Sequence, residues 1–300
     1  MKCVTCGEPA IIDIKRHNAG FCAHHFIEHV HRQVERAISS FRLFSENDRL
    51  LVAVSGGKDS LALWDILNSL GYNAEGLYLH LGIEGYSDRS QQKAEAFATR
   101  EKLTLHCIDV QKETGFSIPG LAHRVRFEPC SVCGTVKRYF MNRFAATHGF
   151  DLILTGHNLD DEAATLLGNL LHWQMGYLGR QSPLLPQKTG LSGKAKPLVR
   201  LTERETAAYT VVRGIDYIIE DCPLSKGATS IGYKEALNML ENLSPGTKHH
   251  FLLGFLKRGK ALFPGDTPQL SPCKNCGQGT TGEICSFCRI IEKAARNDSD

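Results

Sequence analysis

Several features are scarce or missing in this sequence of 300 residues, and each absence excludes a class of protein. No run of about 18 apolar residues occurs, so we expect no membrane-spanning helix. The opening stretch, MKCVTCGEPAIIDIKRH, has no apolar segment of the signal-peptide kind, and we expect a cytoplasmic protein. The formal net charge is only +3, which argues against a uniformly basic nucleic-acid coat, although basic residues cluster within 124–143, 188–200 and 247–260.

A Walker A phosphate loop is also missing from the glycine turn AVSGGKDS at residues 53–60. That motif needs a glycine where this chain has Val52, and a serine or threonine where it has Asp59. The turn nevertheless follows an apolar strand and precedes a helix, and exposed N–H groups at such a junction bind anions. The sequence therefore predicts a phosphate-binding loop of another kind, with a plain glycine turn as the alternative.

Cysteine, in contrast, is plentiful, with 11 residues. An odd number in a cytoplasmic chain argues for metal binding or catalysis rather than for a disulfide framework. Two sets have closely paired ligands in the pattern of a tetrahedral structural zinc site. The predicted zinc ligands are Cys3, Cys6, Cys22 and His25 in the first set, and Cys273, Cys276, Cys285 and Cys288 in the second. His24 is an alternative to His25, which we prefer for its regular spacing.

Four cysteines lie outside both zinc sets. Cys107 belongs to the apolar stretch LHCIDV, and we expect it to be a buried core residue. Cys130 and Cys133 form a CxxC pair in PCSVCGTVKRYF, and Cys222 precedes a proline, as iron–sulfur ligands often do. Three thiolates leave one coordination position open, which is typical of a catalytic metal centre rather than a structural one. A zinc ion on the same three thiolates is the alternative.

Three consecutive carboxylates follow another predicted strand end, in TGHNLDDEA at residues 155–163. Asp160, Asp161 and Glu162 would open a helix, where negative charge is favoured by the helix dipole. They are either a simple helix cap or, beside a phosphate loop, groups that assist Mg-ATP or proton transfer.

Apolar segments alternate with helical patterns through the middle of the chain, which predicts βαβ units and an α/β fold with a parallel sheet covered on both faces. Ligands of such sheets bind at the carboxyl ends of the strands. The expected strands are 50–55, 76–81, 103–110 and 151–157, and the expected helices are 27–44, 60–70, 87–101, 135–148, 160–171, 233–242 and 248–257. A further helix should start at the capping box TERE, residues 202–205, and we expect a mobile loop over 173–197.

The chain divides into three expected domains. An N-terminal zinc finger should cover residues 1–30, a catalytic domain 31–262 and a C-terminal zinc ribbon 263–300. The stretch FPGDTPQLSP, residues 263–272, has the composition of a linker between the last two.

The motifs resemble those of a known family. Ser-Gly-Gly-x-Asp-Ser is similar to the PP-loop of the adenine-nucleotide α-hydrolase, or ATP-pyrophosphatase, superfamily, whose members cleave ATP between the α- and β-phosphates. With CSVCGTVKRY, TGHNLDDEA, DCP, YKEALN and the terminal cysteine sets, the chain resembles the TtuA family of tRNA 2-thiouridine synthetases over almost its full length. This family is part of a wider group of tRNA thiolases.

The resemblance implies cofactors and site residues. ATP, with Mg²⁺, would bind at Ala53, Ser55, Gly56, Gly57, Lys58, Asp59, Ser60, Leu79 and Gly156. A [4Fe-4S] cluster would be held by Cys130, Cys133 and Cys222, with one iron free of protein ligands to hold the sulfur that is delivered. Two Zn²⁺ ions would occupy the terminal sets, and the family's catalytic residues correspond to Lys137 and Asp161.

The implied reaction is the ATP-dependent conversion of a tRNA uridine, the 5-methyluridine of the T-loop, to its 2-thio form. ATP would adenylate the uracil C2 oxygen and release pyrophosphate, after which sulfur attacks C2 and AMP leaves. The expected partners are tRNA, a thiocarboxylated ubiquitin-like sulfur carrier of the TtuB type, and a second copy of the chain. The alternatives are a wobble-uridine thiolase, an amidating PP-loop ligase and a non-enzymatic zinc-finger RNA-binding protein.

Overall fold

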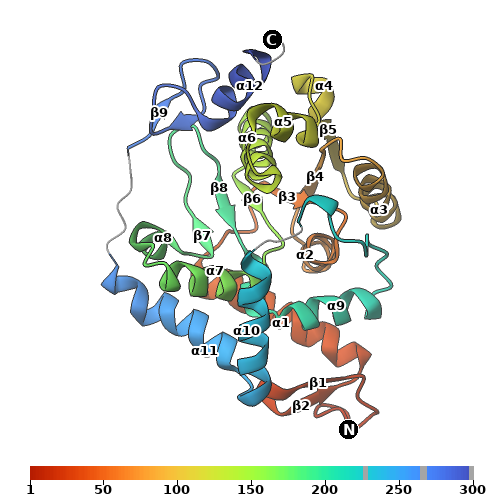
Figure 1. Ribbon diagram of the computed structural model, residues 1–300. Coiled ribbons are helices and arrows are strands. Elements are labelled where there is room, and N and C mark those ends of the chain that lie inside the picture. Colours follow the sequence, from red (N-terminus) through yellow and green to blue (C-terminus); the bar gives the residue numbers. More distant parts are fainter. Residues whose placement is uncertain (226–228, 264–268, 297–300) are drawn as a thin grey trace.

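The computed structural model describes residues 1–225, 229–263 and 269–296, and its centre is a six-stranded sheet in the order β5-β4-β3-β6-β8-β7 (Figure 1). The five strands from β5 to β8 pair in parallel, and β7 pairs antiparallel with β8. The strands are β3 (Leu50–Val54), β4 (Ala74–His80), β5 (Leu105–Asp109), β6 (Leu152–Leu154), β7 (Leu184–Leu185) and β8 (Gly193–Ala195). The expected parallel α/β sheet is confirmed.

Two apolar cores cover the two faces of this sheet. Alternate side chains of a strand point to opposite faces, so Leu50, Val52 and Val54 belong to one core and Leu51 to the other. Helices on the first face are α1 (Ala23–Phe41), α2 (Lys58–Ser69), α3 (Tyr86–Glu101), α7 (Leu159–Leu171) and α9 (Glu203–Val212). Helices on the second face are α5 (Ile118–Val125), α6 (Pro129–His148) and α12 (Ser286–Arg296).

The remaining helices lie at the margins of these layers. The short helix α4 (Val110–Thr114) continues directly from β5, and α8 (Met175–Arg180) follows α7. Helices α10 (Thr229–Leu243) and α11 (Thr247–Gly254) both pack against α7. None of the described helices combines the length and apolarity needed to cross a bilayer.

Two expectations about local structure are wrong. Residues 173–197 are not a loop, since they contain α8, β7 and β8, and β8 extends the central sheet next to β6. These strands have only two and three residues, too few for an alternating pattern to be visible. Cys107 is exposed rather than buried, because β5 is the edge strand of the sheet.

Helix α6 also begins earlier than expected, at Pro129 rather than near residue 135. Proline suits the first turn of a helix, because its fixed φ angle is already helical and no N–H is lost there. The CxxC pair therefore lies inside the first turns of α6, ahead of Lys137 on the same helix. The expected capping box of α9 is confirmed: the Thr202 hydroxyl accepts from the Glu205 N–H, and the Glu205 carboxylate accepts from the Thr202 N–H.

Small hairpins carry the two terminal cysteine sets at opposite ends of the molecule (Figure 1). The N-terminal hairpin pairs β1 (Ile12–Ile14) with β2 (Ala19–Phe21), and its chain continues into α1. The C-terminal ribbon pairs β9 (Ser271–Pro272) with β10 (Gly279–Thr280), and Phe287 stacks on Tyr139 of α6 at 3.5 Å between ring centres. Of the expected linker, residues 264–268 lie outside the described part of the chain.

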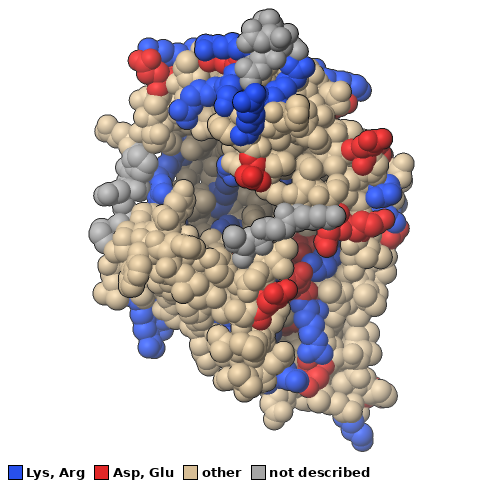
Figure 2. Space-filling view, viewed as in Figure 1, with Lys and Arg blue, Asp and Glu red and all other residues tan. Residues whose placement is uncertain are grey.

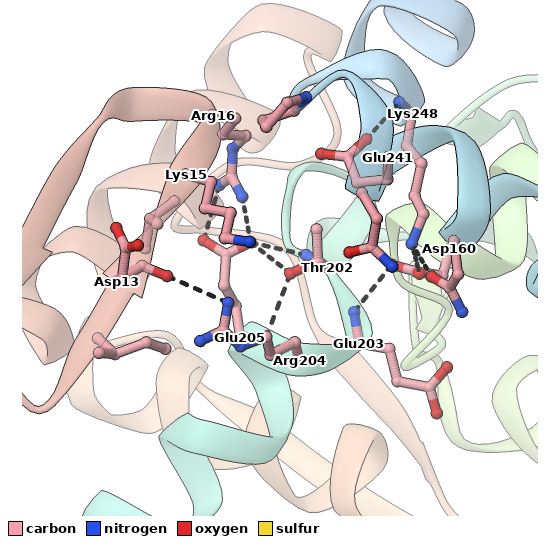
Figure 3. Close-up of a pocket in the computed structure, with 15 residues that line it drawn as sticks. Asp13, Lys15, Arg16, Asp160, Thr202, Glu203, Arg204, Glu205, Glu241 and Lys248 are labelled. Atoms are coloured by element: carbon pink, nitrogen blue, oxygen red, sulfur yellow. Dashed lines mark hydrogen bonds and ion pairs between the residues drawn. The ribbon is translucent and has the colours of Figure 1, made fainter.

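A buried ion pair fastens the N-terminal hairpin to the main domain (Figure 3). The Arg16 guanidinium donates to both carboxylate oxygens of Glu205 at 2.6 and 2.7 Å, and His29 lies 3.3 Å from the same carboxylate. Burial alone would raise the pKa of Glu205, but His29 and Arg16 outweigh it and hold the pKa well below its usual range. The carboxylate is therefore charged in the core and depends on its partners.

We expect Arg16→Met to lower the free energy of unfolding by about 3–5 kcal/mol, because the buried Glu205 carboxylate loses its bidentate partner. Urea denaturation followed by circular dichroism measures this change. The control is Lys112→Met, which removes an exposed ion pair with Asp109 and should cost less than about 1 kcal/mol. Similar losses in the two variants would contradict this account.

Candidate active site

The turn at the carboxyl end of β3 has the geometry of a phosphate-binding loop. Gly57 is the residue preceding α2, so the first N–H groups of that helix point out of the turn. The Ser60 hydroxyl accepts from the Ser55 N–H at 3.1 Å and donates to the Gly57 carbonyl at 2.9 Å. These side-chain bonds keep the turn in shape from within, while the N–H groups in the first turn of α2 face an anion site.

Two glycines are required by close backbone contacts around this turn. Gly56 has a φ angle of +76°, and a Cβ atom there would lie 2.3 Å from the Ser90 carbonyl oxygen of α3. A Cβ atom on Gly156, in the loop after β6, would lie 2.8 Å from the backbone of Asp59. Gly56 therefore lets the β3 loop approach α3, and Gly156 lets the β6 loop approach the start of α2, as the carboxyl ends of neighbouring parallel strands allow.

A cavity of about 570 Å³ opens beside the loop. Six of the nine predicted ATP ligands line it: Ala53, Ser55, Asp59, Ser60, Leu79 and Gly156. Gly56, Gly57 and Lys58 belong to the turn itself and do not line this cavity. Its walls are apolar near β4, from Leu77 and Leu79, and polar near the loop, as a site for a nucleotide requires.

The same cavity contains part of the inner cysteine triad. Cys133 and Cys222 line it together with Lys137, which lies one turn after Cys133 on α6. Cys130 lies beside the Cys222 segment, where its thiol donates to the Leu224 carbonyl at 3.2 Å. Burial raises the pKa of the Cys133 thiol, and the positive charge of Lys137 opposes that rise. The structure thus brings the CxxC pair and Cys222, about 90 residues apart in sequence, together at one end of the phosphate-loop cavity.

Asp161 does not line this cavity. Its carboxylate accepts from the Asn158 N–H at 3.0 Å and completes a capping box for α7, so the simple capping role considered from the sequence is present. The Asp161 carboxylate also pairs with Lys234 of α10 at 2.6 Å. Asn158 connects it to the phosphate loop, because the Asn158 amide donates to Asp59 at 3.2 Å.

A chain of alternating charges runs from the phosphate loop to Asp161. Lys58 pairs with Asp59 at 3.0 Å and with Glu203 at 2.8 Å, and Lys234 connects Glu203, at 3.1 Å, to Asp161. Burial opposes the charged forms of Lys58 and Lys234, yet their acidic neighbours outweigh it and raise both pKa values. Sequence reasoning missed Glu203 and Lys234, although both occur in quoted motifs, TERE and YKEALN.

Three other side chains in the cavity were not predicted as site residues. His157 follows Gly156, and burial, aided by Lys196, lowers its pKa. Lys196 forms two hydrogen bonds to the Glu162 carboxylate, at 2.7 and 2.8 Å. Lys194 is the third, and burial next to Arg138 and Lys196 lowers its pKa to about 8. Lys194 is on β8, a strand that the sequence did not reveal, and Lys196 directly follows that strand.

Each terminal cysteine set brings four ligand atoms within 4.8 Å of one another, close enough for one metal ion. In the first set, His25 Nδ1 lies 3.2 Å from the Cys22 sulfur and 3.5 Å from the Cys3 sulfur. His24 instead forms an exposed ion pair with Glu28 at 3.2 Å. In the second set the members are Cys273, Cys276, Cys285 and Cys288. Both groupings match the sets predicted from spacing.

A parallel sheet with this glycine turn at a strand end is the architecture of PP-loop proteins, and the PP-loop domain model matches residues 26–223. Residues 2–27 match the N-terminal LIM domain of 2-thiouridine synthetase TtuA. The chain belongs to the tRNA-5-methyluridine(54) 2-sulfurtransferase family. It is 46% identical to the member from Thermus thermophilus, over 99% of this chain and 92% of that one, and 44% identical to the member from Thermotoga maritima, over 99% and 98%.

The structure is also similar to a solved one, that of the U34-tRNA thiolase NcsA from Methanococcus maripaludis with its [4Fe-4S] cluster. The match has a TM-score of 0.83 at 26% identity and covers 97% of this chain and 96% of the other. The resemblance expected from the motifs is therefore confirmed, both for the PP-loop fold and for the family of tRNA thiolases.

Gly57→Val should retain the fold but weaken ATP binding by about 1–3 kcal/mol, because the valine side chain would crowd the N–H groups that face the phosphates. The protein itself tolerates a Cβ atom there, where only the Ser55 hydroxyl lies near, at 3.5 Å. Isothermal titration calorimetry with ATP measures the effect, and Gly232→Val, in open space on α10, is the control. Unchanged affinity in a folded Gly57→Val protein would reject the loop as the phosphate site.

Proposed function

We propose that this protein is an ATP-dependent tRNA sulfurtransferase that forms 2-thiouridine, specifically 5-methyl-2-thiouridine in the T-loop. The observation that carries the proposal is one cavity lined by a PP-loop, by Cys133 and Cys222, and by Lys137. Activation by ATP and sulfur transfer need these groups close together. The choice of 5-methyluridine as substrate is supported by the similarity, over nearly the full length, to two tRNA-5-methyluridine(54) 2-sulfurtransferases.

ATP would bind with its phosphates at the turn of residues 55–58 and its base among the apolar side chains of β4, such as Leu77 and Leu79. Mg²⁺ is a hard cation that is commonly shared between carboxylates and phosphates, and Asp59 is the carboxylate that lines the cavity beside the turn. Lys58 and Lys234 would offset the added negative charge, since both are held charged by acidic neighbours.

Cys130, Cys133 and Cys222 would hold a [4Fe-4S] cluster. The donor set fits, because Cys133 and Cys222 line one end of the cavity and the Cys130 thiol lies beside the Cys222 segment. When bound, a cluster with one iron free of protein ligands supplies a position for a sulfide. The terminal sets would hold zinc, whose four protein ligands leave no open position for chemistry.

The proposed chemistry has two displacements. The C2 oxygen of the uracil attacks the α-phosphorus of ATP, the bond to the β-phosphate oxygen breaks, and pyrophosphate leaves while N3 loses its proton. A sulfide sulfur then bonds to C2 and the C2–O bond breaks, so that AMP departs with the former carbonyl oxygen and N3 regains a proton. No electrons are exchanged with an outside oxidant or reductant.

Lys137 would be the catalytic cation, since it lines the same cavity as Cys133, Cys222 and the phosphate loop and can stabilise charge that develops on the α-phosphate. Asp161 would act through its neighbours, because its carboxylate orients Asn158 and Lys234 rather than facing the cavity. The sulfur would come from a thiocarboxylated ubiquitin-like carrier. A second copy of the chain would cover the exposed apolar residues Met239, Leu240 and Leu243 of α10.

Cys222→Ser should remove most of the iron and abolish 2-thiouridine formation, while ATP binding survives because the phosphate loop is a separate element. The assay supplies anaerobically purified protein with tRNA transcript, ATP and sulfide, and mass spectrometry of the digested nucleosides detects and places the product. Cys107→Ser, at an exposed cysteine outside all three sets, is the control. Thiolation confined to position 34 would favour the wobble-uridine alternative, and full thiolation by Cys222→Ser would reject the triad.

Cys276→Ser should release the zinc of the C-terminal ribbon but leave cluster iron and ATP hydrolysis largely intact, because a closed four-ligand site is structural. The ribbon would loosen from α6, where Phe287 stacks on Tyr139. Metal analysis by plasma mass spectrometry separates the two metals. Loss of iron together with zinc would contradict this division.

A further inference from the structure

A second cavity, the basic groove, lies next to the candidate active site. It has a volume of about 630 Å³ and is walled by α7, α8 and the β7–β8 hairpin. Figure 2 shows the face of the molecule hollowed over these strands, with Lys and Arg side chains inside the hollow. The tip of the hairpin reaches the C-terminal ribbon, where the Gly279 N–H donates to the Gly190 carbonyl at 3.3 Å.

The net charge of the side chains that line the basic groove is strongly positive. Five basic side chains line it: Arg180, Lys188, Lys194, Lys196 and Lys260. The acidic side chain among its described lining residues is Glu162, whose two oxygens are both taken by Lys196. Arg180, Lys188 and Lys260 form no ion pair with any carboxylate in the described part of the chain. The groove therefore attracts an anion.

Exposed aromatic side chains occur on α8, which walls the groove, and in the turn before it. Tyr177 lines the groove with 59% of its surface exposed, and the Arg180 guanidinium lies 5.1 Å from the centre of its ring. Trp173 nearby is 72% exposed. Aromatic faces beside a row of cations are what unpaired nucleic-acid bases need, since bases stack on the rings while lysines neutralise the backbone.

The basic groove adjoins the active-site cavity. Leu185, Lys194 and Lys196 line both spaces, so a chain that lies in the groove is placed next to the cavity of the phosphate loop and Lys137. Lys194 stands at the junction on β8. A uridine inside a folded RNA must be turned out of its stack before C2 can meet ATP, and it then needs a path to this cavity.

We propose that the basic groove binds the backbone of the RNA substrate next to the reacting uridine, with Arg180, Lys188 and Lys260 on phosphates and Tyr177 stacked on a base. This inference rests on the proposed function and adds the path by which the substrate enters. A protein partner is disfavoured by the charge, because an interface centre is usually depleted of lysine, whereas phosphate contacts require it.

The test measures binding of a tRNA transcript by fluorescence anisotropy across a salt series. The triple variant Arg180→Ala, Lys188→Ala and Lys260→Ala should bind about 100-fold more weakly at 0.1 M salt, with the slope of log K against log salt shallower by about two to three. Lys112→Ala, on α4 at the opposite edge of the sheet, is the control and should leave affinity and slope unchanged.

A second pair of variants tests the stacking. Tyr177→Ala should weaken RNA binding by about 5-fold or more, and Tyr177→Phe, which keeps the ring, should restore it. Unchanged RNA affinity in the triple variant would overturn the proposal, as would a defect limited to binding of a thiocarboxylated carrier protein. Because wild-type thiolation and ATP binding are measured on the same preparations, failure of the groove is distinguishable from failure of the proposed function.

Discussion

Contact between two strand-end turns is the constraint on which the rest of the site depends. The loop after β6 approaches the start of α2, directly after the β3 loop, so closely that Gly156 has no room for a side chain. This contact places Asn158 within hydrogen-bonding distance of Asp59, and so connects the start of α7 to the phosphate loop. The parallel pairing of β3 with β6 makes the approach possible, because it brings both carboxyl ends to one edge.

The start of α9 extends this arrangement to the N-terminal hairpin. Glu203 and Glu205 are two residues apart in the first turn of α9, and they serve different partners: Glu203 joins Lys58 to Lys234, while Glu205 receives Arg16. Because Arg16 pairs with Glu205, a movement of the hairpin would also displace the start of α9, which carries Glu203. This gives the N-terminal cysteine set a physical route to influence the charges beside the ATP site without contributing a group to the chemistry.

Much of the fold and site follows from the sequence, and the failures have identifiable causes. Strand β3 is a continuous apolar run and the helices after it have clear apolar periods, so these elements were predictable. The terminal metal-ligand sets were predictable because the spacings of their ligands are regular. Strand β8 has three residues and no period of its own, and its place is decided by pairing with β6. The basic groove was hidden for that reason, although its lysines were visible as a local cluster.

The partners of charged and thiol side chains were harder to predict than the helices and strands. Asp161 belongs to the expected run of three carboxylates. The orientation of its side chain, however, is fixed by Asn158 and by Lys234, which lies on a helix about 70 residues later in the chain. No local motif reveals the second partner. The same holds for the triad, since Cys222 meets Cys130 and Cys133 only once α6 and the segment before α10 lie together. The cavity beside them adjoins the basic groove, so that one edge of the sheet brings together the glycine turn, the three thiols and the groove. Sequence order separates these three features, and the parallel sheet unites them.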